Sequence, residues 1–430
     1  MALELKPFSV KQLKLLTWWH EDSPVKDAIG IIADGAIRAG KTLSFAISFI
    51  EWAFKNFTKE NFALCGKTVG SFRRNVWKWF VPLLRQRGYR VKESRSDNLI
   101  TISRWGKKNY FYIFGGRDES SQDLIQGITL AGVLFDEVAL MPESFVNQAT
   151  GRCSIEGSKF WFNCNPDGPT HWFKTGWIDK AEEKKLIHLH FTQEDNLTLS
   201  EAKKEMYRNM YHGVFFKRYI LGLWVAAEGA IYDMWDSEEN TYSHELDEHT
   251  LLTATHWVSI DVGTQNATVF LYIIDDGINI WVEDIYYHSG RDSGQQKTNS
   301  QYCDDLEAFT AGRPIHRVVI DPSAAAFKTE LKRRGFRVKD ADNDVLDGIS
   351  MTASFIGCRI IKVHKRCTQL IREIMAYVWD TTPTLKGNEK PLKRDDHGPD
   401  ALRYFIKTCC KVTRLVDFQK WRQKERKLAA

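Results

Sequence analysis

Residues 35–42, with the sequence GAIRAGKT, have the residue types and spacing of a phosphate-binding loop. In such a loop the glycines Gly35 and Gly40 let backbone N–H groups turn toward phosphate oxygens. Lys41 reaches the β and γ oxygens, and the hydroxyl of Thr42 can ligate Mg²⁺. An apolar run, residues 28–33, precedes the loop and apolar residues at helical spacing follow it. The sequence therefore predicts a nucleotide site where a strand ends and a helix begins.

Two side chains near the loop have more than one interpretation. Arg38 lies inside the loop, where charge builds up during phosphoryl transfer, and can serve as an arginine finger in cis. It can equally pair with a neighbouring acid. Gln12 lies in an upstream amphipathic stretch, where motor ATPases often keep a glutamine that reads adenine, but a solvated helix residue is the equal alternative. Both residues stay open at this point.

Polar groups also follow two later apolar strands. Residues 133–137 form an apolar run that ends in Asp136 and Glu137. Asp136 would hold Mg²⁺ through water and Glu137 would polarise the attacking water, although a strand can also end in surface acids by chance. The run 160–166 ends in amides, and Asn163 could hydrogen-bond the γ-phosphate or its attacking water.

Three aspartates in the second half are candidates for a metal centre. Asp261 and Asp321 each end an apolar strand, and Asp400 lies in the first turn of a helix that Pro399 helps to begin. If they converge, these carboxylates can hold two divalent ions about 3.5–4 Å apart across a scissile phosphate. Hard oxygen ligands favour Mg²⁺ or Mn²⁺ over zinc. His397 could ligate metal, donate a proton or cap the helix.

The elements that must position these residues form two α/β halves. We assign residues 1–235 to the first domain, with a C-terminal subdomain or linker from about residue 170, and the polar, acidic stretch 236–252 to a linker. In residues 253–412 three strands joined by short turns precede alternating helices and strands, which is the order of an RNase H-like fold. Residues 413–430 are a basic tail, and the basic stretch 381–394 is a candidate DNA-guiding loop.

The order of these motifs resembles the large subunit of tailed-phage terminases. The resemblance includes the loop with its internal Arg38, Gln126-Gly127 before residues 133–137, and residues 163–166 followed by His171-Trp172. Three later groups of residues resemble the closing segment of the terminase ATPase domain. They are Arg218-Tyr219, Leu221-Gly222-Leu223-Trp224 and Glu228-Gly229. The resemblance to terminases implies two domains. The first is an ASCE/RecA-like P-loop ATPase domain with a helix containing Gln12 on the adenine side, and the second is an RNase H-like nuclease domain.

The same resemblance implies a function. ATP hydrolysis with Mg²⁺ would drive double-stranded viral DNA into a procapsid, and two Mg²⁺ or Mn²⁺ ions would support cleavage of concatemeric DNA at Asp261, Asp321 and Asp400. Expected partners are double-stranded DNA, the portal protein, the small terminase subunit and further copies of the chain, in a ring of about five on the procapsid, with a monomer possible in solution. The expected location is the cytoplasm of the host cell.

The composition is ordinary for a soluble globular protein, and two alternative functions stay open. The 430 residues are 43% hydrophobic and 27% charged, with no apolar run long enough to span a bilayer and no signal-peptide pattern, and we expect the eight cysteines to be reduced thiols. Residues 260–264 also resemble the first phosphate motif of actin-like sugar kinases, although no second glycine-rich motif follows. A nucleotide-gated DNA clamp, whose acids only bind ions, is the non-catalytic alternative.

Overall fold

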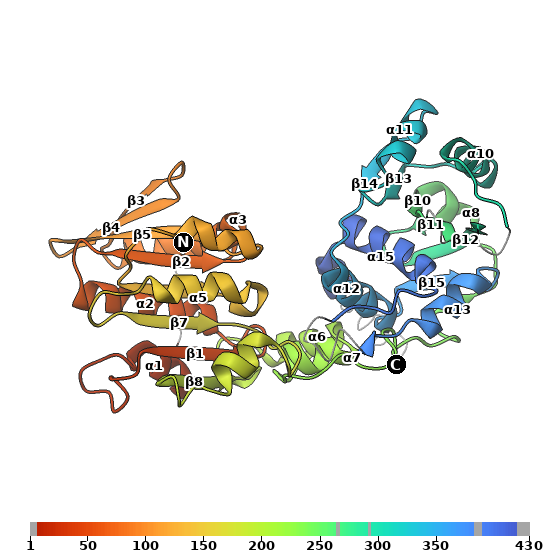
Figure 1. The fold of residues 1–430 in the computed structure, drawn as a ribbon. Coiled ribbons are helices and arrows are strands. Elements are labelled where there is room, and N and C mark those ends of the chain that lie inside the picture. Colours follow the sequence, from red (N-terminus) through yellow and green to blue (C-terminus); the bar gives the residue numbers. More distant parts are fainter. Residues whose placement is uncertain (1–6, 264–266, 291–293, 382–388, 419–430) are drawn as a thin grey trace. The chain divides into compact units, whose positions relative to one another are not determined.

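The computed structural model describes residues 7–263, 267–290, 294–381 and 389–418 of the chain. The chain divides into two compact units, shown as ribbons in Figure 1. The first consists of Met1–Lys204 and Lys217–Ala226, and the second of Glu205–Phe216 and Ala227–Ala430. The chain therefore passes between the units three times. Thr264, residues 382–388 of the expected DNA-guiding loop, and the basic tail from residue 419 lie outside the described residues.

The first unit contains an eight-stranded sheet within the described residues. Side by side, its strands are β3 (Arg90–Ser94), β4 (Leu99–Arg104), β5 (Lys107–Gly115), β2 (Asn61–Gly66), β6 (Gly132–Asp136), β7 (Lys159–Asn163), β1 (Gly30–Gly35) and β8 (Leu186–Phe191). The strands from β5 to β8 in this order pair in parallel, and β3, β4 and β5 pair antiparallel. Because β7 pairs in parallel with both β1 and β6, the carboxyl ends of these three strands lie at one edge of the sheet.

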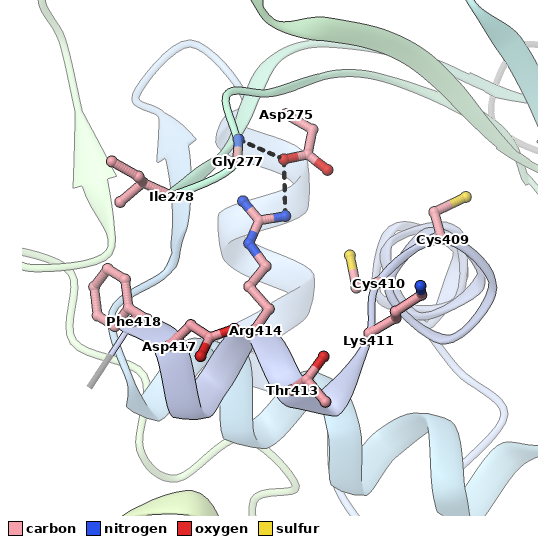
Figure 2. Close-up of a pocket in the computed structure, with 10 residues that line it drawn as sticks. All are labelled: Asp275, Gly277, Ile278, Cys409, Cys410, Lys411, Thr413, Arg414, Asp417 and Phe418. Atoms are coloured by element: carbon pink, nitrogen blue, oxygen red, sulfur yellow. Dashed lines mark hydrogen bonds and ion pairs between the residues drawn. The ribbon is translucent and has the colours of Figure 1, made fainter. Parts of the chain in front are cut away.

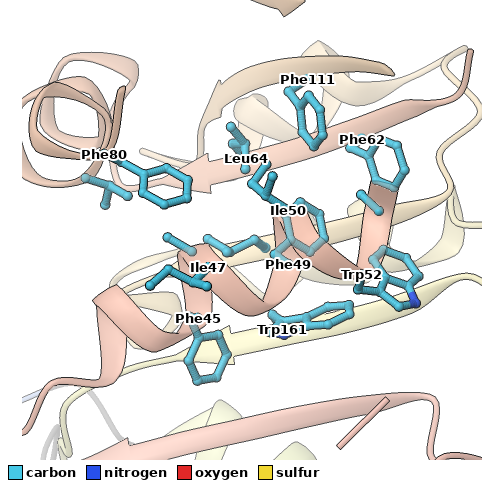
Figure 3. Close-up of a cluster of buried hydrophobic side chains, with 14 of the residues drawn as sticks. Phe45, Ile47, Phe49, Ile50, Trp52, Phe62, Leu64, Phe80, Phe111 and Trp161 are labelled. Carbon is cyan, nitrogen blue, oxygen red and sulfur yellow. The ribbon is translucent and has the colours of Figure 1, made fainter. Parts of the chain in front are cut away.

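Helices cover the two faces of this sheet because its central strands are apolar on both sides. The strand β1 sends Ile31 into one core cluster and Ile32 into the other. In the first cluster, shown in Figure 3, Phe49 of α2 (Lys41–Asn56) packs against Phe62 and Trp161, with ring centroids 5.8 and 5.1 Å away. This packing fixes α2, and with it the loop that precedes α2, against the sheet.

The other helices of the first unit are short. They are α1 (Val10–Thr17), α3 (Val69–Phe72), α4 (Lys78–Gln86), α5 (Glu143–Gly151), the 3-10 helices η2 (Glu119–Ile125), η3 (Val138–Leu140) and η5 (Gln193–Asp195), and the π-helical turn η4 (Lys174–Ile178). A π-helical turn, η1 (Arg73–Trp77), separates α3 from α4. Next in the chain come α6 (Glu201–Met210), α7 (Gly213–Phe215) and η6 (Phe216–Ile220).

The second unit contains a seven-stranded sheet within the described residues. Its order is β14 (Val338–Asp340), β13 (Arg317–Ile320), β10 (Thr255–Asp261), β11 (Ala267–Asp275), β12 (Ile280–Ser289), β15 (Ile361–His364) and β9 (Thr241–Tyr242). The strands β10, β11 and β12 pair antiparallel and the flanking pairs are parallel. The helices that lie wholly within the described residues include α8 (Glu248–Thr253), α10 (Asn299–Phe309), α11 (Ala325–Arg333), α12 (Val345–Gly357), α13 (Thr368–Ala376) and α15 (His397–Cys409). Three antiparallel strands followed by alternating helices and strands is the expected RNase H-like order.

The stretch assigned from its composition to a linker, residues 236–252, lies within the second unit. It contains β9, which pairs in parallel with β15. Asn240 is fully buried, and its side-chain amide donates to the carbonyls of Ile356 and Ile361, both at 3.1 Å. A polar residue that satisfies buried backbone groups gives no apolar periodicity, so this strand is hidden in the sequence.

Two global features complete the fold. All eight cysteines lie in the described part of the chain, and none of them forms a disulfide. Across the described ranges, the helices are too short or too polar to cross a bilayer.

Candidate nucleotide and nuclease sites

The loop at residues 35–42 needs its glycines. Gly35 has φ 120°, and a Cβ there would lie 2.0 Å from the carbonyl oxygen of Phe191. Gly40 has φ 83°, and a Cβ there would lie 2.2 Å from Nε2 of Gln12. Any side chain at either position would collide, because the loop backbone is held tightly between β8 and α1. The loop thus keeps its N–H groups at the start of α2, where the helix terminus favours an anion.

Lys41 is buried at the mouth of this loop. Its Nζ donates to the carbonyls of Gly35 at 2.9 Å and Ala36 at 2.7 Å, and to Oδ1 of Asn165 at 3.1 Å. Burial lowers the pKa of Lys41, and the nearby carboxylate of Glu137 opposes this shift. A buried cation held by neutral acceptors is suited to a polyanionic ligand.

Thr42, Asp136 and Asn163 meet next to Lys41, each from a different element. The Nδ2 of Asn163 donates to Oδ1 of Asp136 at 2.8 Å and to Oγ1 of Thr42 at 3.0 Å, and Thr42 Oγ1 lies 3.4 Å from the same Asp136 oxygen. Among the described atoms, Oδ1 of Asn163 is buried without a hydrogen-bond partner. A hydroxyl, a carboxylate and an unsatisfied amide oxygen fit a hydrated Mg²⁺ by their donor chemistry.

Glu137 follows Asp136 in the left-handed conformation, with φ 60°. This turn directs its carboxylate back to Asn165, whose Nδ2 donates to both oxygens at 3.0 Å. Burial, together with repulsion from Asp136, raises the pKa of Glu137 to about 7. A carboxylate with a pKa near neutral can take a proton from water.

Gln12 lies beside the loop, and Arg38 lies within it. Gln12 is buried at the start of α1, where its Oε1 accepts from the N–H of Ser9 at 2.9 Å and its Nε2 faces Gly40. Arg38 is exposed with φ 60°, and its carbonyl accepts from Nδ2 of Asn196 at 2.6 Å. The adenine contact and the arginine-finger role stay predictions.

In the second unit, Asp261, Asp321 and Asp400 lie around one corner of the sheet. Asp261 ends β10 and Asp321 follows β13, and these strands are parallel neighbours with Ile260 beside Ile320. Asp400 lies in the first turn of α15, which Oγ of Ser259 ties to β10 through a 2.6 Å bond to the carbonyl of Ala401. The topology therefore brings the three carboxylates to one end of the sheet.

The electrostatics of this corner agree with that placement. Burial raises the pKa of Tyr404, and the charges of Asp261, Asp400 and Asp321 all raise it further. Burial also raises the pKa of Asp261, against a hydrogen bond from His397, and Asp400 adds repulsion. In contrast, the pKa of Asp321 is lowered. Burial alone would raise it, but hydrogen bonds to the carboxylate, including those from Ser323, outweigh the effect of burial. All three carboxylates thus lie close enough to the Tyr404 hydroxyl for their charges to act on it.

Each carboxylate is nevertheless engaged by protein groups. Oδ2 of Asp261 lies 2.9 Å from Nδ1 of His397. For Asp321, Oδ1 accepts from the N–H of Ser323 at 2.7 Å and Oδ2 from Nδ2 of Asn343 at 3.4 Å.

Asp400 has the largest set of partners. Its Oδ1 accepts from the Tyr377 hydroxyl at 3.2 Å and from Nη2 of Arg403 at 3.1 Å. Its Oδ2 accepts from Nζ of Lys393 at 3.1 Å. The donor chemistry suits divalent ions, but no three His, Cys, Asp or Glu side chains of the described residues are arranged to hold a metal. In this arrangement the metal-ligand roles of Asp261, Asp321, Asp400 and His397 stay predictions.

Comparison with known proteins identifies the family. Residues 32–238 match the family described as "Terminase large subunit, T4likevirus-type, N-terminal". A crystal structure of the large terminase from a thermophilic bacteriophage is 51% identical to the chain with a TM-score of 0.89, and the match covers 93% of this chain and 98% of that one. The chain belongs to the bacteriophage large-terminase family. Structures of the same phage's large terminase in complex with ADP and with ATP-gamma-S are 50% and 49% identical, with TM-scores of 0.88 and 0.87, and each match covers 94% of this chain and 99% of that one. No curated protein gives a significant match.

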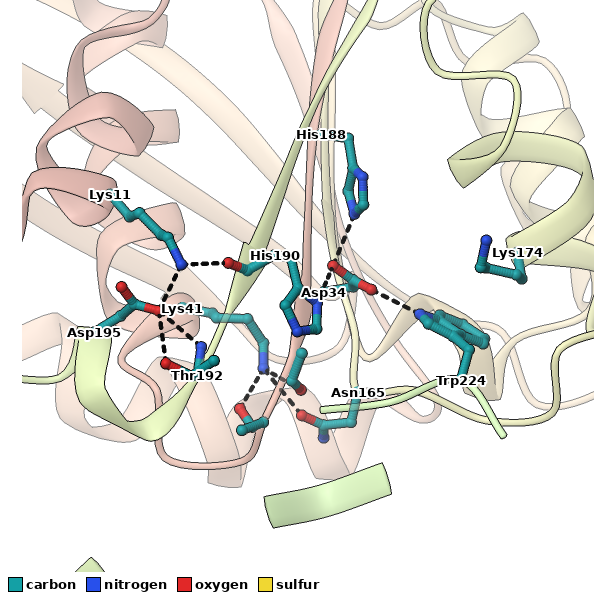
Figure 4. Close-up of polar contacts among 12 residues, drawn as sticks. Lys11, Asp34, Lys41, Asn165, Lys174, His188, His190, Thr192, Asp195 and Trp224 are labelled. Carbon is teal, nitrogen blue, oxygen red and sulfur yellow. Dashed lines mark hydrogen bonds and ion pairs between the residues drawn. The ribbon is translucent and has the colours of Figure 1, made fainter. Parts of the chain in front are cut away.

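Two features of the first unit of this family member were not singled out from its sequence. Asn165 bridges Lys41 and Glu137, although only its position in an amide-rich strand end pointed to it. Asp34, directly before the loop, accepts hydrogen bonds from His188, His190 and Trp224 (Figure 4). The spacing His-x-His places both histidines on one face of a strand and was the available signal.

A cavity of about 510 Å³ in the second unit is separate from both sites (Figure 2). It lies beside the turn after β11, where Arg414 pairs with Asp275 at 2.8 Å. Asp275 is opposite Thr255 at the start of β10, whereas Asp261 is at the end of β10. The cavity is thus at the other end of the sheet from the candidate nuclease carboxylates.

Proposed function

We propose that this large terminase hydrolyses ATP in its first unit to move double-stranded viral DNA into a procapsid. Family membership makes the protein part of a DNA-packaging motor. The observation that carries the ATPase proposal is the meeting of Lys41, Asn165 and Glu137 at the end of the loop. The complexes of the thermophilic-phage enzyme with ADP and ATP-gamma-S support ATP as the nucleotide.

The proposed roles follow from the geometry of the side chains. The loop amides and Lys41 bind the phosphates, and Glu137 accepts a proton from the attacking water while Asn165 orients its carboxylate. Thr42 and Asp136 are positioned to hold a Mg²⁺ ion, which when bound would neutralise charge on the phosphates. Arg38 is proposed to stabilise transition-state charge, and Gln12 to contact adenine.

Two variants test the ATPase proposal. Lys41→Ala should lose nucleotide affinity and ATP turnover together. Glu137→Gln should keep nucleotide affinity within about threefold and lose turnover by about 10²–10⁴, because an amide cannot act as a base. Turnover by Glu137→Gln within tenfold of the unaltered protein would remove Glu137 from this role. Asp321→Asn, altered in the other unit, is the matched control and should retain turnover.

The second proposed activity is metal-dependent cleavage of concatemeric DNA by the second unit. It is supported by the RNase H-like order of strands and by the placement of Asp261, Asp321 and Asp400 at one end of the sheet. Divalent ions, Mg²⁺ or Mn²⁺, would supply activation of water and of the leaving oxygen. The present hydrogen bonds of Asp261, Asp321 and Asp400 would have to rearrange for these residues to bind such ions.

Plasmid cleavage tests this activity. With Mn²⁺, the unaltered protein should nick supercoiled plasmid, Asp321→Asn should not, and Lys41→Ala should cleave at an unchanged rate. Equal cleavage by Asp321→Asn and the unaltered protein would overturn the nuclease proposal. It would favour the DNA clamp, whereas phosphate transfer to a sugar would favour the kinase alternative.

Assembly on the procapsid is part of the same proposal. We propose contacts with the portal protein, the small terminase subunit and other copies of the chain in a ring of about five, within the host cytoplasm. Family membership supports packaging partners in general. Light scattering of the protein with and without isolated portal would test the ring. A mass that stays that of one chain in both samples would contradict it.

A further inference from the structure

Residues 217–226 return from the second unit to the first and lie against the phosphate loop. The chain on either side, Glu205–Phe216 and the residues from Ala227, belongs to the second unit. Within the segment, the carbonyl of Tyr219 accepts from the N–H of Ile37 at 2.8 Å. The segment thus binds a backbone group of the loop itself.

Gly222 makes the closest approach of the segment to the loop. Its φ is +74°, and a Cβ at this position would lie 2.9 Å from the nitrogen of Ala36 and 3.2 Å from Cα of Gly35. On the other side, the N–H of Ala36 donates to the carbonyl of Phe191 at 2.8 Å. The start of the loop is therefore enclosed between β8 and residues 217–226.

The buried carboxylate of Asp34 joins residues 217–226 to β1, the strand that precedes the loop. Asp34 is 1% exposed, and its Oδ2 accepts from Nε1 of Trp224 at 2.6 Å. Its Oδ1 lies 2.8 Å from Nε2 of His188 and 3.1 Å from Nδ1 of His190 (Figure 4). Burial alone would raise the pKa of Asp34, but the hydrogen bonds of the two histidines and of Trp224 hold it well below its usual range. An ionised carboxylate can only accept hydrogen bonds, so His188, His190 and Trp224 must each donate an N–H to Asp34.

We infer that residues 217–226 brace the phosphate loop and that Trp224 is a positioning residue for ATP hydrolysis. This inference rests on the proposed ATPase function of the first unit. Neither Trp224 nor Asp34 belongs to the groups assigned to phosphate, metal or water. Their effect on hydrolysis passes through the backbone of Gly35, Ala36 and Ile37, whose placement sets the positions of the bound phosphates.

Two glycines of the same conformation provide the sharpest test. Gly222 and Gly229 have φ +74° and +73°, but a Cβ on Gly229 would meet nothing within 4 Å. Alanine therefore strains the backbone equally at both positions and presses on the loop only at Gly222. Gly222→Ala should lower kcat for ATP by about tenfold or more, because the added methyl displaces the loop backbone that orients the bound phosphates, with KM changed less than about threefold. Gly229→Ala should stay within about twofold of the unaltered protein.

A second pair of variants tests the indole contact. Trp224→Phe keeps an aromatic ring but removes the donor to Asp34, and it should also lower kcat by about tenfold. Trp79→Phe is the control, since Nε1 of Trp79 donates to the carbonyl of Asn75 on a helix surface. Hydrogen exchange followed by mass spectrometry should show faster exchange in residues 217–226 for Trp224→Phe than for Trp79→Phe. A purely structural role would lower Tm and leave kcat at 20 °C unchanged.

The outcomes separate this inference from the ATPase proposal. If Lys41→Ala is inactive while Gly222→Ala and Trp224→Phe match their controls in kcat, the brace is wrong and the ATPase proposal stands. If Lys41→Ala hydrolyses ATP normally, the ATPase proposal itself fails. Loss of kcat in Gly222→Ala and Trp224→Phe, with both controls active and all four proteins folded by circular dichroism, supports the brace.

Discussion

Asn165 connects the two oppositely charged groups of the nucleotide site through one amide. Its Oδ1 accepts from Lys41 at 3.1 Å, and its Nδ2 donates to both oxygens of Glu137. The cation and the base are thus held on opposite ends of a neutral side chain. Neutral Glu137 is favoured below pH 7 in this arrangement because burial raises its pKa to about 7.

This raised pKa predicts how stability depends on pH. An unfolded glutamate ionises near 4.5, so between pH 4.5 and 7 the folded protein binds the proton more tightly, and stability from this group falls as pH rises. Glu137→Gln removes the ionisation. At pH 8 it should raise the free energy of unfolding of the nucleotide-free protein by on the order of 1–2 kcal/mol, with a smaller gain at pH 5.

Calorimetry at the two pH values measures this difference as a shift of Tm. Glu156→Gln, in an exposed loop, is the control and should change Tm equally at both pH values. A Glu137→Gln gain that is larger at pH 5 than at pH 8 would contradict the sign of the argument.

Asp321 and Asp400 should respond differently to neutralisation. Asp400 is 4% exposed and pairs with Arg403, which is 2% exposed and has a raised pKa because of that carboxylate despite its burial. Asp400→Asn leaves the guanidinium without its counter-charge and should cost about 3 kcal/mol. Asp321 is bonded mainly within its own turn, so Asp321→Asn should cost less than about 1 kcal/mol. Urea unfolding of both variants tests this order, and equal costs would contradict it.

The sequence indicated which residues lie together where their arrangement depends on local spacing. Gly35, Gly40, Lys41 and Thr42 lie in one loop, and Glu137 directly follows Asp136 at the end of β6, so neighbours in the chain are neighbours in space. The contacts of Asp34 with Trp224, and of Asp400 with Tyr377, join residues far apart in the chain. Such pairs depend on how the sheets and helices pack, which the periodicity of one sequence does not contain.

At the scale of elements, the position of Asp400 depends on the start of α15. Glu373 of α13 is fully buried, and its Oε2 accepts from the N–H of Gly398 at 2.7 Å. A carboxylate at a helix N-terminus accepts a hydrogen bond from an otherwise unpaired N–H and interacts favourably with the positive end of the helix dipole. Glu373 therefore acts as a cap supplied by another helix.

Removal of this cap should weaken the second unit. Glu373→Ala should lower the free energy of unfolding by about 2 kcal/mol, the loss of a cap together with a buried hydrogen bond. Glu238→Ala, on an exposed stretch of the same unit, is the control. If urea midpoints of the two variants agree, α15 does not depend on Glu373.

Elements with strong periodicity were predictable, and elements held by single contacts were not. The three antiparallel strands β10, β11 and β12 follow from apolar runs separated by turn residues. The strand β9 consists of Thr241 and Tyr242 only, and its pairing with β15 leaves no periodic pattern. The π-helical turn at Arg73–Trp77 likewise has no signal in apolar spacing.

At the scale of the whole molecule, the boundary between the two units that packing defines lies earlier in the chain than the boundary suggested by composition. The acidic stretch after residue 235 suggested a boundary, but the second unit already includes the chain from Ala227. Ile231 is buried and its N–H donates to the carbonyl of Tyr377 at 2.8 Å, and Tyr232 is 2% exposed. Composition reports the polarity of a segment, whereas a domain boundary depends on which core receives its few apolar side chains.

This division predicts the behaviour of fragments of the second unit. A fragment of residues 227–430 keeps Ile231, Tyr232 and β9, whereas a fragment of residues 253–430, the start assigned from sequence, loses all three. Each buried apolar side chain contributes roughly 1.5–3 kcal/mol, so the longer fragment should be more stable by at least about 3 kcal/mol. Urea unfolding followed by circular dichroism measures the difference. A fragment with Ile231→Ser and Tyr232→Ser in residues 227–430 is the matched control and should lose most of that gain, whereas equal stability of all three fragments would place the boundary near residue 253.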